Sequence, residues 1–311
     1  MSTAVADVET TTDPDAPAPP GDPAAQASSD RAFPVRRISF FDGDAADVPH
    51  LFMDGDIVMS HIVAVLSSLF PEGEDYFVRS VRHYRDQITD PVLKKQVAGF
   101  IGQEAIHGRE HRAFNERLAE LGFPTDKIDR FTGKRLKFDE KISPPKVRLA
   151  VTAALEHYTA TLAEVLLADE RAQAMFSEDE VRHLLMWHAI EESEHKAVAF
   201  DVYKACVDDE KVRTRVMNAI TIGFLGTSTL WAIWSIARDP AARDLEGLRR
   251  SIAKVKSSPW LSKDVRKRIR DYNRPDFHPD DHDASELLET WRTRLFGEAG
   301  TLVDHLATKA S

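Results

Sequence analysis

Two short segments of the chain each place a glutamate three residues before a histidine, Glu104 with His107 and Glu192 with His195. Residues three positions apart lie on one side of an α-helix, so a carboxylate oxygen and an imidazole nitrogen can converge on the same metal ion. One Glu-x-x-His in a helix-rich chain is a weak signal. Two copies on separate helices indicate a shared site for metal ions.

Both pairs lie on the apolar face of a predicted helix. In the later segment that face reads, at steps of three and four, Val181, Leu185, His188, Glu192, His195, Ala199 and Val202. In the earlier segment it reads Leu93, Val97, Phe100, Glu104, His107, His111, Phe114 and Leu118. Three further charged residues of the later segment fall largely off this face: Glu191, Glu194 and Lys196. The acidic and imidazole groups on the two faces are therefore predicted to be buried.

Each of two other predicted helices contributes one inward glutamate. Glu156 lies between small residues, Ala153 and Ala160, that leave room beside it. Glu74 shares a face with Phe70 and with apolar residues after it. Four buried glutamates would be strongly destabilising unless cations compensate them. The set predicts two iron ions, with manganese as the alternative, because oxygen and nitrogen ligands without thiolate suit these metals.

The hydrophobic pattern predicts an all-α chain built on a four-helix bundle. The predicted helices span residues 56–85 with a break or kink at Pro71, 90–121, 143–168 and 177–207. The predicted N-caps include Asp90, Ser143 and Ser177, the last with Glu180 in capping-box position. Residues 124–143 are predicted to form a polar loop, and residues 36–41 a short strand or an extended arm. The predicted organisation is a disordered tail over 1–32, an extended lead-in over 33–55, the bundle over 56–210 and a helical extension packed on it over 211–311.

The run of uncharged residues over 216–237 is long enough to cross a membrane, but several Thr and Ser residues and two glycines dilute it. We favour packing on the bundle, and contact with a membrane stays open because residues 241–270 are basic and amphipathic. The net charge of −10 argues against a nucleic-acid partner. The single cysteine, Cys206, excludes an intrachain disulfide and a thiolate cluster. The expected location is the cytoplasm, with attachment to the inner membrane as the alternative.

The segments PEGEDYF, FIGQEAIHGREH, ALEHYTA and WHAIEESEHKAVAFD are similar to the ferritin-like di-iron carboxylate proteins. More closely they resemble a bacterial family of predicted metal-dependent hydrolases, over roughly residues 35–290. The resemblance implies a ferritin-like bundle that binds two metal ions through a defined set: Glu74, Glu104, His107, Glu156, Glu192 and His195.

The stretch from His188 to His195 is also similar to the fourth helix of the p-aminobenzoate N-oxygenase group. A histidine one turn before the glutamate is a further ligand there, which implies His188 as a seventh ligand. The chain has no counterpart of that group's substrate pocket. His111 has no matching role, and it is interpreted as a partner of a ligand or a core residue rather than as another ligand.

Two other polar groups are interpreted as solvated. Asp201 is expected in an exposed salt bridge rather than at a ligand histidine. His278 and His282 lie in the proline-containing segment FHPDDHD, whose spacing could bind a metal but is more typical of a turn.

Three functions fit these residues. The favoured one is a di-iron oxidoreductase that uses O2 to oxygenate, N-oxidise or desaturate a small or apolar organic molecule, with Glu104, Glu156 and Glu192 as its catalytic carboxylates. An apolar wall would shelter the reaction from water: Phe70, Phe77, Phe100 and Phe114. An external electron donor, such as an electron-transfer protein, is expected because the chain has no flavin or nicotinamide motif. The alternative is a two-metal hydrolase. A non-catalytic metal-binding protein is least favoured, and a homodimer is left open.

Overall fold

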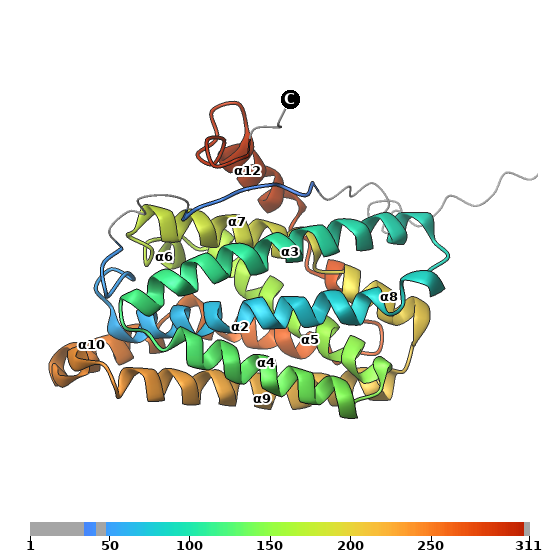
Figure 1. The fold of residues 1–311 in the computed structure, drawn as a ribbon. Helices are drawn as coiled ribbons and strands as arrows, with labels where there is room; N and C mark the ends of the chain where they lie inside the picture. The colour runs from blue at the N-terminus through green and yellow to red at the C-terminus, as the bar shows by residue number, and fades with distance from the viewer. Residues whose placement is uncertain (1–33, 42–47, 308–311) are drawn as a thin grey trace, which may run out of the picture. The chain divides into compact units, whose positions relative to one another are not determined.

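The candidate site is carried by a bundle of four helices that lie side by side (Figure 1): α2 (Ile57–Arg82), α3 (Pro91–Glu120), α5 (Pro145–Ala168) and α7 (Asp179–His195). The computed structural model describes residues 34–41 and 48–307. These described residues contain no β-strand, only an isolated antiparallel bridge between Ile38 and Leu306. The all-α class and the four-helix bundle are therefore confirmed. The predicted disordered tail over 1–32 lies outside the described residues.

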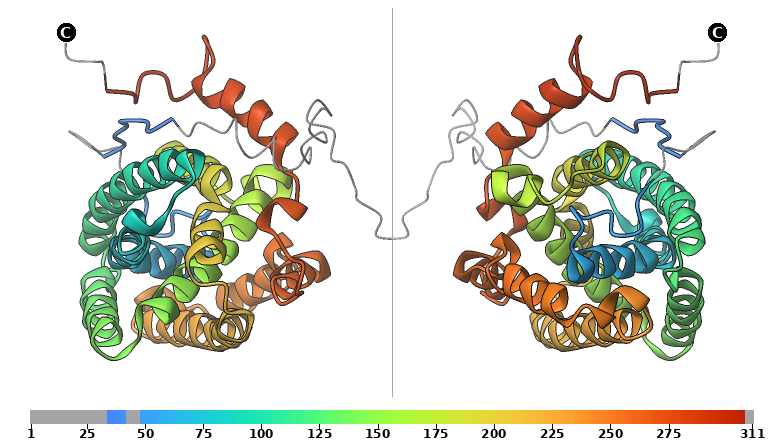
Figure 2. Two further views of the ribbon diagram at one scale, coloured as in Figure 1. Left: turned by 90° about the vertical axis from the view of Figure 1, so that its right-hand side faces the viewer. Right: turned by 90° about the vertical axis from the view of Figure 1, so that its left-hand side faces the viewer.

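Shorter or peripheral helices surround the bundle: α4 (Thr125–Ile142), α6 (Glu170–Gln173), α8 (Val198–Cys206), α9 (Glu210–Ile236), α10 (Leu245–Lys256), α11 (Lys263–Asp271) and α12 (Ser285–Phe296). Single 3₁₀ turns connect some of them: Arg85–Gln87, Pro240–Arg243, Pro259–Leu261 and Pro279–Asp281. Seen along the bundle, α4 and α9 cover one side and α12 lies on the opposite side (Figure 2). The contacts of α9 with α2 and α5, and of α11 with α5, place the C-terminal helices against the bundle.

Helix α2 continues through Pro71 without a break, so the prediction of a break there is wrong, while the alternative of a kink stays a prediction. Proline has no N–H to donate to the carbonyl four residues earlier, which here belongs to Ser67. The side-chain amide of Asn115 on α3 donates to that carbonyl instead, at 3.0 Å. Because a partner from the neighbouring helix replaces the missing bond, α2 stays helical and keeps Glu74 on the face that points into the bundle.

We expect Asn115→Leu to destabilise the protein by about 1–3 kcal/mol, because it leaves the buried carbonyl of Ser67 without a donor. The second substitution Pro71→Ala should recover part of this loss, since alanine restores the N–H of the helix. Chemical unfolding of the single and double variants measures the coupling. If Pro71→Ala has the same effect in both backgrounds, the compensation does not exist.

Four other features differ from their predictions. Residues 124–143 form helix α4 rather than a loop; α4 packs on α2 with few buried apolar residues, which explains the weak pattern. Ser143 caps the C-terminal end of α4 and donates to Asp139, so α5 begins after Pro144 instead. Ser177 does not cap α7 either, because the helix begins at Asp179 after Glu178 and has no side-chain cap. The predicted fourth helix is interrupted after His195 and resumes at Val198 as α8.

Helix α9 is the one helix in the described part of the chain that is long and apolar enough to cross a membrane. This statement rests on length and composition alone, and buried core helices of soluble proteins meet the same criterion. Met217, Ala232 and Ser235 pack inward, whereas only 11% of its most apolar window is buried. Ile222 and Leu230 are strongly exposed. The helix thus contacts the bundle along one narrow side.

Candidate metal centre

The seven residues predicted as metal ligands all point into the interior of the bundle. Helix α2 contributes Glu74, α3 contributes Glu104 and His107, α5 contributes Glu156, and α7 contributes His188, Glu192 and His195. Each is buried, and the most exposed of them, His188, is 6% accessible. Four helices thus bring together four carboxylates and three imidazoles that the sequence separates by as many as 121 positions, from residue 74 to residue 195.

One half of the cluster surrounds Nε2 of His195. This nitrogen lies 3.1 Å from Oε1 of Glu104, 3.4 Å from Oε2 of Glu156 and 3.7 Å from Oε2 of Glu192. Glu104, Glu192 and His195 offer ligand atoms that all lie within 4.8 Å of one another, a spacing that allows them to share one ion. Glu156 enters the same space from α5.

The other half is built around Glu192 and two histidines. Nε2 of His188 lies 3.3 Å from Oε1 of Glu192, and Nδ1 of His107 lies 3.6 Å from the same oxygen. Nδ1 of His107 is also 4.0 Å from Oε1 of Glu74. Glu74, His107, His188 and Glu192 form a second group whose ligand atoms lie within 4.8 Å. Because Glu192 belongs to both groups, its carboxylate can bridge two neighbouring ions.

The carboxylate oxygens of this cluster are buried and, in the described part of the chain, largely lack hydrogen-bond donors, as expected of metal ligands. Within the described residues, neither side-chain oxygen of Glu74, Glu104 or Glu156 accepts a hydrogen bond, although all are buried. The close contacts to imidazole nitrogens are not aligned as hydrogen bonds. Buried polar atoms are rarely left without partners. A set of carboxylate oxygens and imidazole nitrogens without thiolate fits iron or manganese, so the residues present fit the predicted pair of ions.

The imidazole of His195 is oriented by Gln103. The amide nitrogen of Gln103 donates to Glu194 at 2.9 Å, which turns its oxygen toward Nδ1 of His195 at 3.1 Å. An amide oxygen only accepts, so the proton of the neutral imidazole resides on Nδ1. Nε2 then presents its lone pair to the carboxylates, as a metal ligand requires.

A longer chain of hydrogen bonds orients His188. The amide of Asn115 donates to the Ser67 carbonyl, so its oxygen accepts from the Ser67 hydroxyl at 2.7 Å. The Ser67 oxygen then accepts from Nδ1 of His111 at 2.9 Å, and Nε2 of His111 accepts from Nδ1 of His188 at 3.1 Å. The lone pair of His188 is thereby left on Nε2, facing Glu192. His111 therefore positions a candidate ligand, which fits the first of the two roles considered for it, a partner of a ligand or a core residue.

Glu191 is a residue of the site that the sequence prediction missed. It was predicted to lie off the buried face, but it is fully buried and its Oε2 lies 3.2 Å from Nε2 of His107. Its other oxygen accepts from the guanidinium of Arg36 at 2.9 Å. A carboxylate behind a histidine that faces a metal site fixes the ring orientation and makes the imidazole a stronger ligand.

Glu194 and Lys196 were also predicted to lie off the buried face, and both are buried. Glu194 accepts from Arg36 at 2.7 Å and from Arg292 of α12 at 2.8 Å. Lys196 pairs with Glu164 at 2.8 Å. The reason is that α7 is covered on its outer side by the segment 34–41 and by α12, so the helix has no solvent face along this stretch. The sequence held one sign of this burial. Helix α7 has no clearly polar face, and the segment before the bundle contains an arginine, Arg36, that can pair with Glu191 and Glu194.

Protons replace the cations when no metal is bound. Burial raises the pKa of Glu74 and of Glu156 well above the ordinary range, and the carboxylate of Glu104 raises both further. Burial lowers the pKa of His107 and His195, but the surrounding carboxylates outweigh it and hold both pKa values well above the ordinary range. Metal binding must therefore displace protons, and it becomes stronger as the pH rises.

Two of the four predicted phenylalanines contact the cluster directly. Phe70 packs against the rings of His111 and His188, with centroids 4.7 Å away in both cases. Phe100 meets the ring of His195 edge-on at 5.0 Å. Phe77 and Phe114 belong to the two large apolar clusters on either side and exclude water at longer range. Aromatic rings thus pack on the cluster at His188 and at His195.

Asp201 pairs with His278 rather than with a ligand histidine. Nε2 of His278 lies 2.8 Å from Oδ1 of Asp201, and both side chains are about one-third exposed, which agrees with the predicted solvated salt bridge. Neither His278 nor His282 belongs to a group of described residues spaced for a metal ion.

This pair predicts a pH-dependent contribution to stability. Burial lowers the pKa of His278, but Asp201 outweighs burial and holds it above the usual value. The stabilisation is therefore complete below the unfolded pKa and is lost as the pH rises through the folded pKa. We expect His278→Gln to destabilise by about 0.5 kcal/mol at pH ~5.5 and by less at pH ~9, as measured by chemical unfolding, because exposed pairs contribute little. An equal decrease in the free energy of unfolding at both pH values would show that the charge of His278 does not contribute to stability.

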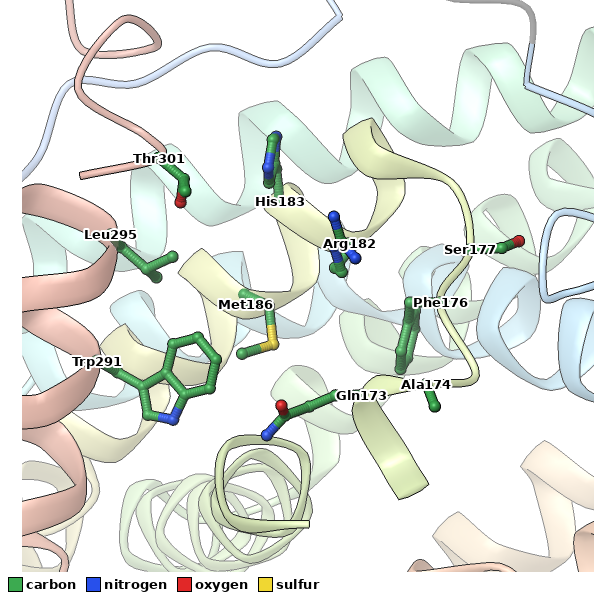
Figure 3. A pocket seen from close by; sticks show the side chains of 10 residues that line it. All are labelled: Gln173, Ala174, Phe176, Ser177, Arg182, His183, Met186, Trp291, Leu295 and Thr301. Carbon is green, nitrogen blue, oxygen red and sulfur yellow. The ribbon is translucent and has the colours of Figure 1, made fainter. Parts of the chain in front are cut away.

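Two cavities lie beside the bundle. The larger has a volume of about 1620 Å³ and reaches the cluster at His188 and Phe70. The smaller, of about 510 Å³, lies between α6, α7 and α12, and Trp291, Met186 and His183 line it (Figure 3). None of the seven candidate ligands lines the smaller cavity. The larger one therefore offers a molecule a route to the candidate metal centre.

Comparison with known proteins places the chain in a family. No curated protein and no solved structure matches it. The model of one protein family matches residues 34–283, a range that contains all seven candidate ligands as well as Arg36 and Glu191. Its description is predicted metal-dependent hydrolase, which agrees with the resemblance noted in the sequence and with the buried Glu/His groups. Because the match covers most of its length, the chain belongs to the family of predicted metal-dependent hydrolases.

Proposed function

We propose that the seven buried side chains hold two metal ions and that the chain is a dinuclear metal enzyme. The observation that carries this proposal is the convergence of four helices on carboxylates whose buried oxygens accept no hydrogen bond among the described residues. Glu104, Glu156, Glu192 and His195 would hold one ion, and Glu74, His107, His188 and Glu192 the other. The positioning contacts of His111, Gln103 and Glu191 belong to the same proposal.

The reaction that this geometry supports best is oxidation of an apolar organic molecule by O2 at a di-iron site. Iron bound in this way supplies redox chemistry with O2, and insertion of one oxygen atom into a substrate releases water and consumes two protons and two electrons. An electron-transfer protein is the expected source of the electrons. Glu104, Glu156 and Glu192 would balance changes in charge at the site, which is why we propose them as the catalytic carboxylates.

The surroundings of the site support chemistry that must exclude water. The rings of Phe70 and Phe100 pack on the histidines of the cluster, and the side near His188 leads into an apolar cavity. His188 and His195 are held by hydrogen bonds in orientations that turn Nε2 toward the carboxylates, so neither ring must rotate to bind metal. A substrate reaching the cluster from the cavity would meet His188 and Phe70 first.

Hydrolysis is the second candidate, and the description of the family supports it more directly than it supports oxidation. Two metals in the same cluster would lower the pKa of a bound water and polarise a carbonyl or phosphoryl oxygen of the substrate. This reaction needs neither O2 nor an electron donor, which separates it from the first candidate.

The experiment that distinguishes the two is oxygen consumption by protein loaded anaerobically with ferrous iron. Oxidation predicts rapid uptake of one O2 for each pair of ferrous ions when air is admitted, and none in a variant that cannot hold the metals. Hydrolysis predicts turnover of a chromogenic ester by manganese- or zinc-loaded protein at a rate that removal of O2 does not change. Ester turnover without O2 uptake would overturn the oxidative proposal in favour of the hydrolytic one.

A further inference from the structure

The large cavity is elongated along the bundle and has a predominantly apolar wall. On α9 the residues that line it extend from Thr221 to Ile236, about 22 Å at 1.5 Å per residue. On α2 they extend from Val58 to Phe70, or about 18 Å. The volume of about 1620 Å³ exceeds that of most sites for compact small molecules, which are ~300–1,000 Å³. The shape therefore suits an extended molecule better than a compact one.

The inner wall of the cavity is lined mainly by apolar side chains. Helix α5 contributes Leu162 and Leu166, helix α9 contributes Phe224, and helix α7 contributes Leu185 beside His188. His188 is both a member of the candidate metal cluster and part of this wall. A ligand that fills the cavity with an apolar chain would consequently bring part of that chain next to the cluster.

The rim of the cavity is positively charged. It carries five exposed cationic side chains in two groups: Arg238 and Arg243 just after α9, and Lys263, Arg266 and Arg270 on α11. The α11 group lies toward the other end of α9, where Asn273 bonds to Asn218. In the part of the chain that the structure describes, none of the five forms an ion pair. Asp239 is the one acidic residue among those lining the cavity, and it is engaged by His50 and His61. Arg266 and Arg270 donate through Nε to backbone carbonyls of their own helix, and no carboxylate among the described residues pairs with them. Arginines without an acidic partner are complementary to an anionic group.

We propose that the cavity binds a free long-chain carboxylic acid, with its carboxylate at Arg266 and Arg270 of α11 and its hydrocarbon chain inside, reaching His188. The length of the cavity accommodates such a chain, since an acyl chain spans about 15 Å, half the thickness of the ~30 Å hydrocarbon core of a bilayer. The inference names the substrate class of the site described above, and so it rests on the proposed function. The inference is tested by ligand binding rather than by turnover, so the inferred ligand class and the proposed function can be disproved independently.

The test is displacement of a fluorescent fatty acid from the full chain, as purified, by hexadecanoic acid, octanoic acid and hexadecanol. Each CH2 that enters the cavity should tighten binding about fourfold, so hexadecanoic acid is expected to bind at least 100-fold more tightly than octanoic acid. Hexadecanol has the chain without the charge and should bind several-fold more weakly than the acid. Equal affinity for octanoic and hexadecanoic acids would overturn the proposal.

Matched variants locate the charged end and the chain. Arg266→Gln with Arg270→Gln should weaken binding of the acid about three- to tenfold and leave hexadecanol unchanged, because an exposed ion pair contributes little. Lys267→Gln, on the same helix but outside the cavity lining, is the control. Ser228→Phe fills the cavity from α9 and should weaken both ligands at least tenfold, whereas Thr227→Phe, on the outer side of the helix, should not.

Three outcomes bear on the inference separately from the proposed function. Binding that survives loss of the metals supports the inference even if the metal-centred chemistry is wrong. Protein with two metals per chain but no affinity for hexadecanoic acid overturns the inference and leaves the metal centre standing. Binding to phosphatidylglycerol vesicles without binding to the free acid also overturns it, because the rim would then recognise a membrane surface. The arginine pair lies on the surface, so the test does not depend on whether Ser228→Phe folds.

Discussion

Glu156→Gln is expected to lower the metal content of the protein from about two ions per chain and, at the same time, to raise the melting temperature of the metal-free form. Glu156 is fully buried, and burial raises its pKa well above the ordinary range, so the carboxyl destabilises the protein when no cation is present. Glutamine keeps the shape and removes the charge. The melting temperature of the metal-free form should therefore rise, by about 2–4 °C for each kcal/mol of stability that is recovered.

Glu164→Gln is the matched control for this prediction. Glu164 lies on the same helix about two turns later, is also buried, and pairs with Lys196 and Arg268. Its loss should lower the melting temperature and leave the metal content unchanged. Elemental analysis and calorimetry of both variants give the two readouts. Loss of stability together with full metal content in Glu156→Gln would remove this residue from the site.

Arg36→Met is expected to destabilise the protein by about 3–5 kcal/mol, because it leaves buried carboxylates without their partner. The guanidinium of Arg36 donates to Glu191 and Glu194, both of which are almost completely buried. Glu194 keeps Arg292, whereas the described part of the chain leaves Glu191 with no cationic partner other than the imidazole of His107. The free energy of unfolding, measured in denaturant, should fall much further than after Arg37→Met, since Arg37 is exposed one residue away.

The double variant Arg36→Met with Glu191→Gln distinguishes loss of charge pairing from loss of packing. If the buried negative charge is the cause, removing it should restore a large part of the stability that Arg36→Met loses. A double variant less stable than Arg36→Met alone would contradict this explanation. Because Glu191 faces His107, both single variants should also weaken metal binding, which can be measured by titration.

The candidate ligands could be predicted from the sequence because each depends on the local period of a single helix. Glu104 with His107 and Glu192 with His195 need only the rule that residues three apart share a face, and Glu156 needs only its small neighbours. Burial of these groups follows from the apolar residues around them. The structure brings all seven together, which the spacing alone could only suggest.

The features that could not be predicted depend on contacts between distant segments. Glu191 is buried because the arm around Arg36, 155 residues earlier, covers α7, and no periodicity within α7 contains that information. The continuity of α2 at Pro71 depends on Asn115 of another helix. Helix α4 has few apolar residues and owes its place to packing on α2, so its sequence has the polar character of a loop.

The central claim is that two metal ions lie side by side among the carboxylates of the four helices. Anomalous X-ray diffraction from crystals of the metal-loaded protein, collected on either side of the iron and manganese absorption edges, tests it most directly. We expect two anomalous peaks, one among Glu104, Glu156, Glu192 and His195 and the other among Glu74, His107, His188 and Glu192. A cluster without any anomalous peak, with its carboxylates bonded to protein groups or water alone, would contradict the account.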